Sequence, residues 1–325
     1  MGRSAKNVKA IGVDLGGSHV LAAVVEDDGS IRSKHEIDVE DRSFDNVMKL
    51  LETAIHGALG DAGSNVAGIG IGSPGNIDAD TGTIRYSPNF GWNNVPLGQK
   101  LRDHFGMPVF VGNDARCATL GEYTYGVGRG TQDFVLITLG TGIGGGIVAD
   151  GNLILGHAMG AGEVGHHQIR PTDGFVCSCG KIGCFEAQAS GTGLIRHATA
   201  LIPSFPRSAL LAGAPNDLGS KRIRKAAQAG DQHAVAAWKN YISDLALGVA
   251  NIVAFINPEV IALGGGVSKA EEFLLDAVRP LVDDLVTMAP RGSTRISIAQ
   301  FENDAGALGA ATMAMRGGLT TGKVA

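Results

Sequence analysis

Glycine ends most of the short apolar runs of this chain, and this feature most constrains its fold. Glycine accounts for 49 of the 325 residues, with no collagen period and no low-complexity tract; its usual share is only about 7%. A chain that turns tightly after each strand leaves bare backbone N–H groups, which are suited to holding phosphate. The distribution therefore favours an α/β enzyme that handles phosphates.

Short β-rich runs alternate with helical stretches, which predicts an α/β fold rather than a bundle or a sandwich. The first three runs predict an antiparallel meander with a turn at Asp28-Gly29. A helix is expected behind Ser43, its predicted N-cap. The expected strands are 8–15, 20–25, 31–39, 66–71, 108–111, 134–139, 260–263 and 296–298, and the expected helices are 44–59, 115–125, 234–256 and 305–315.

The pattern of the first meander recurs further along the chain. Val13–Ser18 matches Ile137–Gly142, and the turn Asp28-Gly29 matches Asp150-Gly151. Two similar units are therefore predicted, with chance likeness between glycine-rich hairpins as the alternative.

Composition excludes several classes of protein. The chain has 27 Lys and Arg against 32 Asp and Glu, a net charge of −5, without a basic cluster that would predict nucleic-acid or acidic-membrane binding. Its apolar runs are shorter than the roughly 20 residues of a membrane span, and its first residues lack a signal-peptide core. We expect a soluble, cytoplasmic protein.

The sequence argues against two common nucleotide-binding motifs. Gly140–Gly145 satisfies G-x-G-x-x-G, but the residues that follow predict a hairpin instead of the helix that a dinucleotide fold requires. No P-loop string occurs anywhere in the sequence. The alternative is a pair of glycine-rich turns, Gly16-Gly17-Ser18 and Gly140-Thr141-Gly142, facing one another across a cleft and binding anions through backbone N–H groups.

Other residues complete this predicted phosphate site. Asp14 ends a strand and could hold Mg²⁺ directly or through water, or it could be a carboxylate that stabilises the turn. The turn Gly264-Gly265-Gly266 offers a further bare surface, suited to adenine or ribose.

One histidine and three cysteines have the spacing H-x10-C-x-C-x4-C, at His166, Cys177, Cys179 and Cys184. One imidazole and three thiolates complete a tetrahedral zinc shell without an open position, so the predicted Zn²⁺ is structural. His167 is the alternative histidine ligand, and a disulfide or redox pair is the alternative for the cysteines.

Three carboxylates stand close to these features. Asn113-Asp114 ends a predicted strand, which makes Asp114 the best candidate for a general base, with capping of the next helix as the alternative. Glu163 and Glu186 bracket the cysteine cluster, so a bound zinc would fix both.

Together these motifs resemble the ROK (repressor, open reading frame, kinase) family of sugar kinases, and most closely its glucokinases. The resemblance runs from Gly12 to about Ala311 and rests on Val13–Ser18, Ser73-Pro74-Gly75, Ser87-Pro88-Asn89 with Trp92, Gly112–Ala115, Leu139–Gly142, Gly162–His166 and Cys177–Glu186. It implies an actin-like ATPase (ribonuclease-H-like) α/β fold with two domains around a central cleft. We expect the domains at 1–118, with a C-terminal helix at about 304–325 packing back on it, and at 119–303.

The resemblance also implies an activity: transfer of the ATP γ-phosphoryl group to the 6-hydroxyl of D-glucose, with Mg²⁺ accompanying ATP. Asp114 is the implied catalytic base. The implied sugar-binding residues are Gly75, Asn89, Asn113, Asp114, Glu163, His166 and Glu186, and the implied nucleotide-binding residues are Asp14, Gly16, Gly17, Ser18, Gly140, Thr141, Gly142, Gly264 and Gly265. The chain departs from the family at Ser18 and His19, where many members carry Thr and Lys.

Alternatives within the family stay open. The chain could phosphorylate another hexose, such as N-acetylmannosamine, N-acetylglucosamine, mannose or fructose, or act as a non-catalytic sugar-binding regulator. A DNA-binding repressor is not expected, because its helix-turn-helix would precede a first glycine-rich motif that here begins at about residue 11. A homodimer or higher homo-oligomer is expected, and polyphosphate remains an alternative donor to ATP.

Overall fold

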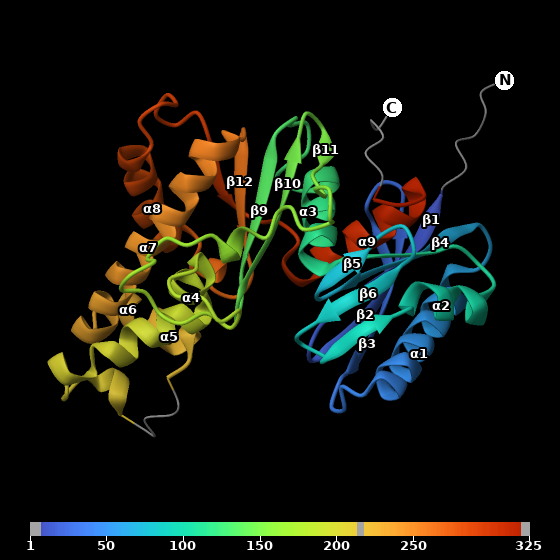
Figure 1. Cartoon of the computed structure of the whole chain (residues 1–325), viewed down its shortest axis with the longest axis horizontal. Coiled ribbons are helices and arrows are strands. Elements are labelled where there is room, and N and C mark those ends of the chain that lie inside the picture. The colour runs from blue at the N-terminus through green and yellow to red at the C-terminus, as the bar shows by residue number, and fades with distance from the viewer. Residues whose placement is uncertain (1–7, 213–217, 320–325) are drawn as a thin grey trace. The chain divides into compact units, whose positions relative to one another are not determined.

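The computed structural model describes residues 8–212 and 218–319 and divides into two compact units (Figure 1). Unit 1 is Met1–Gly130, Asp150–Ala161 and Gln300–Ala325, and unit 2 is Thr131–Ala149 and Gly162–Ala299. Compared with the expected boundary at 118, residues 119–130 and the segment 150–161 belong to unit 1.

Unit 1 contains a five-stranded sheet, a small three-stranded sheet and four helices among its described residues. Its elements are β1 (Lys9–Leu15), β2 (His19–Glu26), β3 (Ile31–Asp38), α1 (Phe44–Ala62), β4 (Val66–Ser73), β5 (Asn76–Asp78), β6 (Thr83–Ser87), β7 (Trp92–Val95), α2 (Leu97–Phe105), β8 (Val109–Asn113), α3 (Asp114–Tyr125) and α9 (Ala305–Arg316).

Strands β1, β2 and β4 of the large sheet in unit 1 are buried on both faces, since successive strand residues point to opposite sides and nearly all of them are buried. In β2, Val20, Ala22 and Val24 join the apolar cluster that contains α1. Their neighbours Leu21, Ala23 and Val25 join the cluster that contains α9. This burial explains why β2 reads as a nearly continuous apolar run.

Helix α9 approaches the sheet more closely than side chains would allow. A Cβ on Gly12 of β1 would lie 1.9 Å from the backbone oxygen of Ala307, and one on Gly70 of β4 would lie 1.8 Å from that of Ala310. Glycine at both positions therefore lets the helix backbone rest on the two central strands. This contact brings the start of α9 beside the end of β1.

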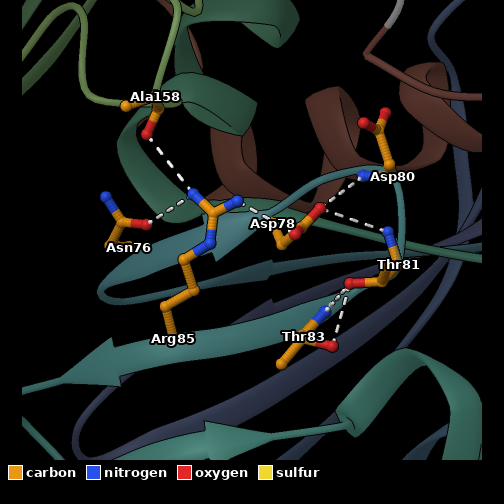
Figure 2. Close-up of polar contacts among 7 residues, drawn as sticks. All are labelled: Asn76, Asp78, Asp80, Thr81, Thr83, Arg85 and Ala158. Atoms are coloured by element: carbon orange, nitrogen blue, oxygen red, sulfur yellow. Dashed lines mark hydrogen bonds and ion pairs between the residues drawn. The ribbon is translucent and has the colours of Figure 1, made fainter.

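The small sheet β5-β6-β7 holds the segment 150–161 on unit 1 (Figure 2). Arg85 on β6 donates to Asp78 Oδ2 at 2.9 Å and to the carbonyl oxygen of Ala158 at 3.4 Å. Figure 2 shows its guanidinium between these groups and Asn76. This sheet is not predicted from the sequence, because its strands are only three to five residues long.

Unit 2 is built around a second five-stranded sheet covered by helices. Its elements are β9 (Phe134–Leu139), β10 (Ile143–Ala149), the 3-10 turn η1 (Val164–His166), α4 (Phe185–Ala189), α5 (Gly191–Ala200), α6 (Ser220–Gln228), α7 (Gln232–Ile256), β12 (Val260–Gly264), α8 (Glu272–Leu285) and β13 (Arg295–Ile298); the short strand β11 (Asn152–Leu153) extends this sheet.

The two large sheets have the same topology. Their orders are β3-β2-β1-β4-β8 and β11-β10-β9-β12-β13. In each, the central strand (β1 or β9) pairs antiparallel with the next strand in the chain (β2 or β10) and parallel with a later one (β4 or β12). That strand in turn pairs parallel with the last strand of the sheet (β8 or β13). Asp14 and Thr138 occupy equivalent places, each the penultimate residue of its strand. The predicted internal repeat is confirmed.

Most of the expected elements are confirmed within one or two residues, but Ser43 does not cap α1 as expected. It stands at the N-cap position, yet its hydroxyl donates to Asp41 Oδ2 at 2.6 Å and makes no capping bond. Among the described residues, no helix combines the length and apolarity needed to cross a bilayer.

Candidate functional site

In unit 1, the candidate residues gather where three parallel strands end. Strand β1 pairs with β4, and β4 pairs with β8, so that Asp14 lies opposite Gly72 and Ser73 lies opposite Asn113. The carboxyl ends of parallel strands meet at one edge of a sheet, which is where α/β proteins bind ligands. The register therefore brings Asp14 and the Asn113-Asp114 pair to the same edge.

Asp14 is a partly buried carboxylate packed against the start of α9. A Cβ on Gly306 would lie 2.7 Å from its carboxyl carbon. Burial raises the pKa of the Asp14 carboxyl to about 7, and the nearby carboxylate of Asp114 adds to this effect. A group held in this way gains from a cation, because a cation offsets both the lost hydration and the repulsion.

Asn113 and Asp114 make different contacts at the start of α3. Asn113 caps α3, because its Oδ1 accepts from the Arg116 N–H at 3.1 Å, while its Nδ2 donates to the carbonyl oxygen of Gly75 at 3.2 Å. Capping thus falls to Asn113 rather than to Asp114. Asp114 is the first residue of α3, and its Oδ1 accepts from the Ala115 N–H at 2.8 Å.

The turn Gly16-Gly17-Ser18 lies beside Asn89 and beside Arg42, which the sequence does not mark as a site residue. A Cβ on Gly17 would lie 3.7 Å from Arg42 Nη2 and 3.8 Å from Asn89 Nδ2. Arg42 also donates to the carbonyl oxygen of Asn89 at 3.4 Å. Arg42 therefore brings a positive charge to this turn, where His19 stands in place of the family's usual Lys. No local pattern distinguished it from any other surface arginine.

In unit 2, glycine-rich turns end the neighbouring parallel strands β9 and β12. The first, Gly140-Thr141-Gly142, is anchored on the start of α5: the Gly191 N–H donates to the Gly140 oxygen at 2.8 Å, and Thr192 Oγ1 donates to the Thr141 oxygen at 2.8 Å. The second, Gly264-Gly265, packs on the end of β9, since a Cβ on Gly265 would lie 2.7 Å from the backbone of Leu139.

The four predicted metal ligands converge in a segment that we call the metal loop, residues 163–186. The ligand atoms of His166, Cys177, Cys179 and Cys184 all lie within 4.8 Å of one another, an arrangement that could hold a metal ion. The Sγ atoms of Cys179 and Cys184 are 3.7 Å apart, far longer than the roughly 2.05 Å of a disulfide.

The structure also decides between the two adjacent histidines. His166 Nδ1 lies 3.8 Å from Cys177 Sγ, within the cluster. His167 instead points Nδ1 at the carbonyl oxygen of Val164, 2.6 Å away, and its ring packs on Phe185. His167 is therefore a structural residue.

Glu186 links the metal loop to the turn at Gly142. Its Oε2 accepts from the Ile143 N–H at 3.0 Å, and its Oε1 accepts from Ser178 Oγ at 3.0 Å. Ser178, a residue not anticipated from the sequence, stands between two metal ligands. Glu163 is exposed at the N-cap of η1, three residues before His166.

The predicted site residues thus form two sets, one in each unit. Unit 1 holds Asp14, Gly16, Gly17, Ser18, Gly75, Asn89, Asn113 and Asp114, and unit 2 holds Gly140, Thr141, Gly142, Glu163, His166, Cys177, Cys179, Cys184, Glu186, Gly264 and Gly265. Each set lies at strand ends or in the metal loop.

The raised pKa of Asp14 predicts a pH dependence of stability. Its folded pKa of about 7 exceeds the ordinary value of 3.8, so the ligand-free protein loses stability as the pH rises from about 4 to 7. Asp14→Asn removes this loss and should raise the free energy of unfolding at pH 8 by roughly 2 to 4 kcal/mol. Urea denaturation between pH 5 and 8 measures it.

Asp28→Asn is the matched control. Asp28 is exposed, and the Ser30 N–H holds its pKa below the ordinary value. This variant should therefore not be stabilised at pH 8. An Asp14→Asn protein with the pH profile of the wild type contradicts the assigned environment.

The chain is similar to known proteins over nearly its whole length. The chain is 39% identical over 311 residues to a glucokinase of Thermotoga maritima, covering 94% of this chain and 97% of that one. Its fold is similar to a ROK family glucokinase of Streptomyces griseus solved with glucose and AMPPNP, with TM-score 0.83, 35% identity and coverage of 95% and 99%. A ROK hexokinase of Thermus thermophilus matches with TM-score 0.80, 32% identity and coverage of 94% and 97%.

These likenesses confirm the predicted α/β fold of actin-like ATPase sugar kinases. The family model described as ROK family matches residues 10–316. The chain therefore belongs to the ROK family.

Proposed function

We propose that this chain is an ATP-dependent hexokinase that phosphorylates the 6-hydroxyl of D-glucose. The observation that carries the proposal is the placement of Asp114 beside Asp14 at the carboxyl edge of a parallel sheet. One carboxylate can accept a proton while the other is suited to a cation. The likeness to glucokinases over nearly the whole chain supports glucose as the acceptor and ATP as the donor.

In the proposed reaction, Asp114 accepts the proton of the 6-hydroxyl as the hydroxyl oxygen forms its bond to the γ-phosphorus. The bond from that phosphorus to the β,γ-bridging oxygen breaks, and ADP leaves. Asn113 fixes the start of α3 and so orients Asp114. Such transfers depend chiefly on positioning and charge neutralisation.

Phosphates are assigned to the glycine-rich turns. Backbone N–H groups of Gly16-Gly17-Ser18 and of Gly140-Thr141-Gly142 would hold the phosphate oxygens, with the guanidinium of Arg42 beside the first turn. We assign Gly264-Gly265 to the nucleoside. Bound Mg²⁺, held through Asp14, would neutralise phosphate charge.

Zinc is the metal that we assign to the metal loop. A tetrahedral zinc with bonds to sulfur of about 2.3 Å separates two thiolates by about 3.8 Å, close to the 3.7 Å between Cys179 and Cys184. The three cysteines and one histidine leave no open position, so the zinc would be structural. With Nδ1 of His166 toward the cluster, its Nε2 remains for a sugar hydroxyl.

Sugar hydroxyls are assigned to polar groups in both units. Unit 1 supplies Asn89, Asn113, Asp114 and the backbone at Gly75, and unit 2 supplies Glu163, His166 and Glu186. A site built to pair hydroxyls rejects analogues that leave its polar groups unpaired. We therefore favour an unmodified hexose over an N-acetylated one.

Replacing the base tests the proposed chemistry. Asp114→Asn keeps size and hydrogen bonding but removes the proton acceptor, so kcat should fall by at least about 10²-fold while glucose still binds. A coupled ATP assay and calorimetry measure the two effects. Asp103→Asn, a carboxylate on α2 that accepts from Gln99, is the control with unchanged kcat, and an Asp114→Asn enzyme with near-normal kcat would refute the assignment.

Removing one thiolate tests the metal. Cys179→Ser should lose zinc and raise the KM for glucose on the order of tenfold or more, because Glu186 and His166 lie in the same loop. Elemental analysis and sugar kinetics give the two readings. Cys117→Ser, outside the loop, should keep its zinc. A wild-type protein that is fully active and contains no metal would overturn the zinc proposal.

A panel of acceptors tests the substrate. The wild type should give its highest kcat/KM with glucose and a lower value with mannose, which differs in the orientation of one hydroxyl. Fructose, N-acetylglucosamine and N-acetylmannosamine should be poorer still under identical ATP and Mg²⁺. An N-acetylated sugar or fructose exceeding glucose tenfold would assign the chain to another hexose.

A further inference from the structure

A fully buried carboxylate, Asp244, lies in the middle of helix α7. Its helical neighbours Tyr241 and Leu245 are also fully buried, and the proposed phosphoryl transfer makes no use of it. A carboxylate is costly to bury unless it is paired. Its partners therefore indicate what it does.

Asp244 joins three separate segments of unit 2. Its Oδ1 accepts from Arg170 Nε at 2.6 Å. Its Oδ2 lies 3.2 Å from His197 Nε2 on α5, but it accepts no hydrogen bond among the described residues. The same nitrogen lies 3.1 Å from the carbonyl oxygen of Gln188 on α4. A carbonyl oxygen only accepts hydrogen bonds, so this nitrogen carries the hydrogen.

Arg170 connects Asp244 to the metal ligands. It lies in the metal loop between His166 and Cys177, and its backbone N–H donates to the Gly183 oxygen at 3.1 Å. Gly183 directly precedes the ligand Cys184. A Cβ on Gly183 would lie 1.7 Å from the Arg170 oxygen, so the segments of the loop around Arg170 and around Gly183 are in close contact. Fixing Arg170 therefore fixes both segments.

His197 gives the loop a second point of attachment. Its ring meets Phe175 edge to face, with centroids 5.1 Å apart, and Phe175 precedes the ligand Cys177 by two residues. His197 thus lies between the carboxylate of Asp244 and the ligand-bearing strand.

The metal loop contacts the same face of α7 a second time, one turn after Asp244. A Cβ on Gly248 would lie 2.2 Å from the ring of Phe185, the residue that follows Cys184. Positions four apart share a helix face. The loop is therefore seated on α7 by an ion pair at Asp244 and by close packing at Gly248.

We propose that Asp244 is a positioning residue: paired with Arg170 and His197, it fixes the metal loop on α7 and thereby sets the positions of Glu163, His166 and Glu186. The effect on sugar binding rests on the function proposed above, whereas the effect on the loop does not. Well-packed apolar residues often stabilise a protein as well as a buried ion pair does. The pair at Asp244 therefore serves the geometry of the loop.

Asp244→Asn tests this role because it removes the charge at nearly constant volume. Three readings follow: amide hydrogen exchange of residues 163–186, zinc release to a chromogenic chelator, and KM for glucose and for ATP. We expect faster exchange, zinc release on the order of tenfold faster and a glucose KM raised on the order of tenfold. The ATP KM should rise less, because only Glu186 connects the loop to the turn at Gly142 in this scheme.

Two further variants separate positioning from general stability. Asp231 caps the N-terminus of the same helix, because its Oδ1 accepts from the Ala234 N–H at 3.0 Å. Asp231→Ala removes this cap, so it should lower Tm and leave loop exchange and the glucose KM unchanged. The double variant Arg170→Met with Asp244→Leu should recover Tm but keep the raised glucose KM.

The proposal is overturned if Asp244→Asn folds with the wild-type exchange, zinc release and glucose KM, or if Asp231→Ala changes all three equally. A wild type inactive on every hexose would instead refute the proposed function. Loop exchange needs neither metal nor sugar, so it decides the role of Asp244 in either case.

Discussion

The convergence of one imidazole and three thiolates is the constraint on which the geometry of unit 2 depends. Without a metal, thiolates held within 4.8 Å of one another would repel. A metal bound there would replace this repulsion with four bonds and would fix a loop that has little regular structure of its own. The loop also carries Glu186, which bonds to the turn at Gly142 through the Ile143 N–H. Glu186 therefore links the candidate metal site to the turn to which we assign phosphate.

In unit 1, the candidate site residues are positioned by the sheet itself and not by a metal loop. Its functional groups stand at the ends of β1, β4 and β8, whose register is fixed by the parallel ladder. Helix α9 rests directly on two of these strands at Gly12 and Gly70. Asp14 packs against the start of α9 and lies near Asp114, and both its burial and that neighbouring carboxylate raise the pKa of its carboxyl.

Local signals in the sequence were enough to predict much of this architecture. The cysteine spacing predicted the cluster that the structure brings together, and glycine after each strand predicted the turns, because both signals lie within a few residues. The repeat of the β1-β2 and β9-β10 hairpins predicted the duplicated sheets. Resemblance to a family added the proposed sugar-binding role of Asn89, which no spacing rule provides.

Features that depend on distant contacts could not be predicted in the same way. Arg42 approaches Asn89 across 47 residues, and Arg170 pairs with Asp244 across 74. The choice of His166 over His167 depended on where each ring points, and spacing is silent on that. Short strands such as β5 leave too few residues for a period-2 pattern to stand out.

The metal loop couples the proposed zinc and sugar sites, because Glu163, His166 and Glu186 all lie in it. If glucose binds through His166, Glu163 and Glu186 and this strengthens zinc binding, then zinc must raise the affinity for glucose by the same factor. Saturating glucose should raise the affinity of the wild-type protein for zinc, measured at equilibrium against a competing chelator, by about fivefold or more, whereas a sugar that does not bind should leave it unchanged. Equal zinc affinities with and without glucose, in a protein that phosphorylates glucose, would contradict this coupling.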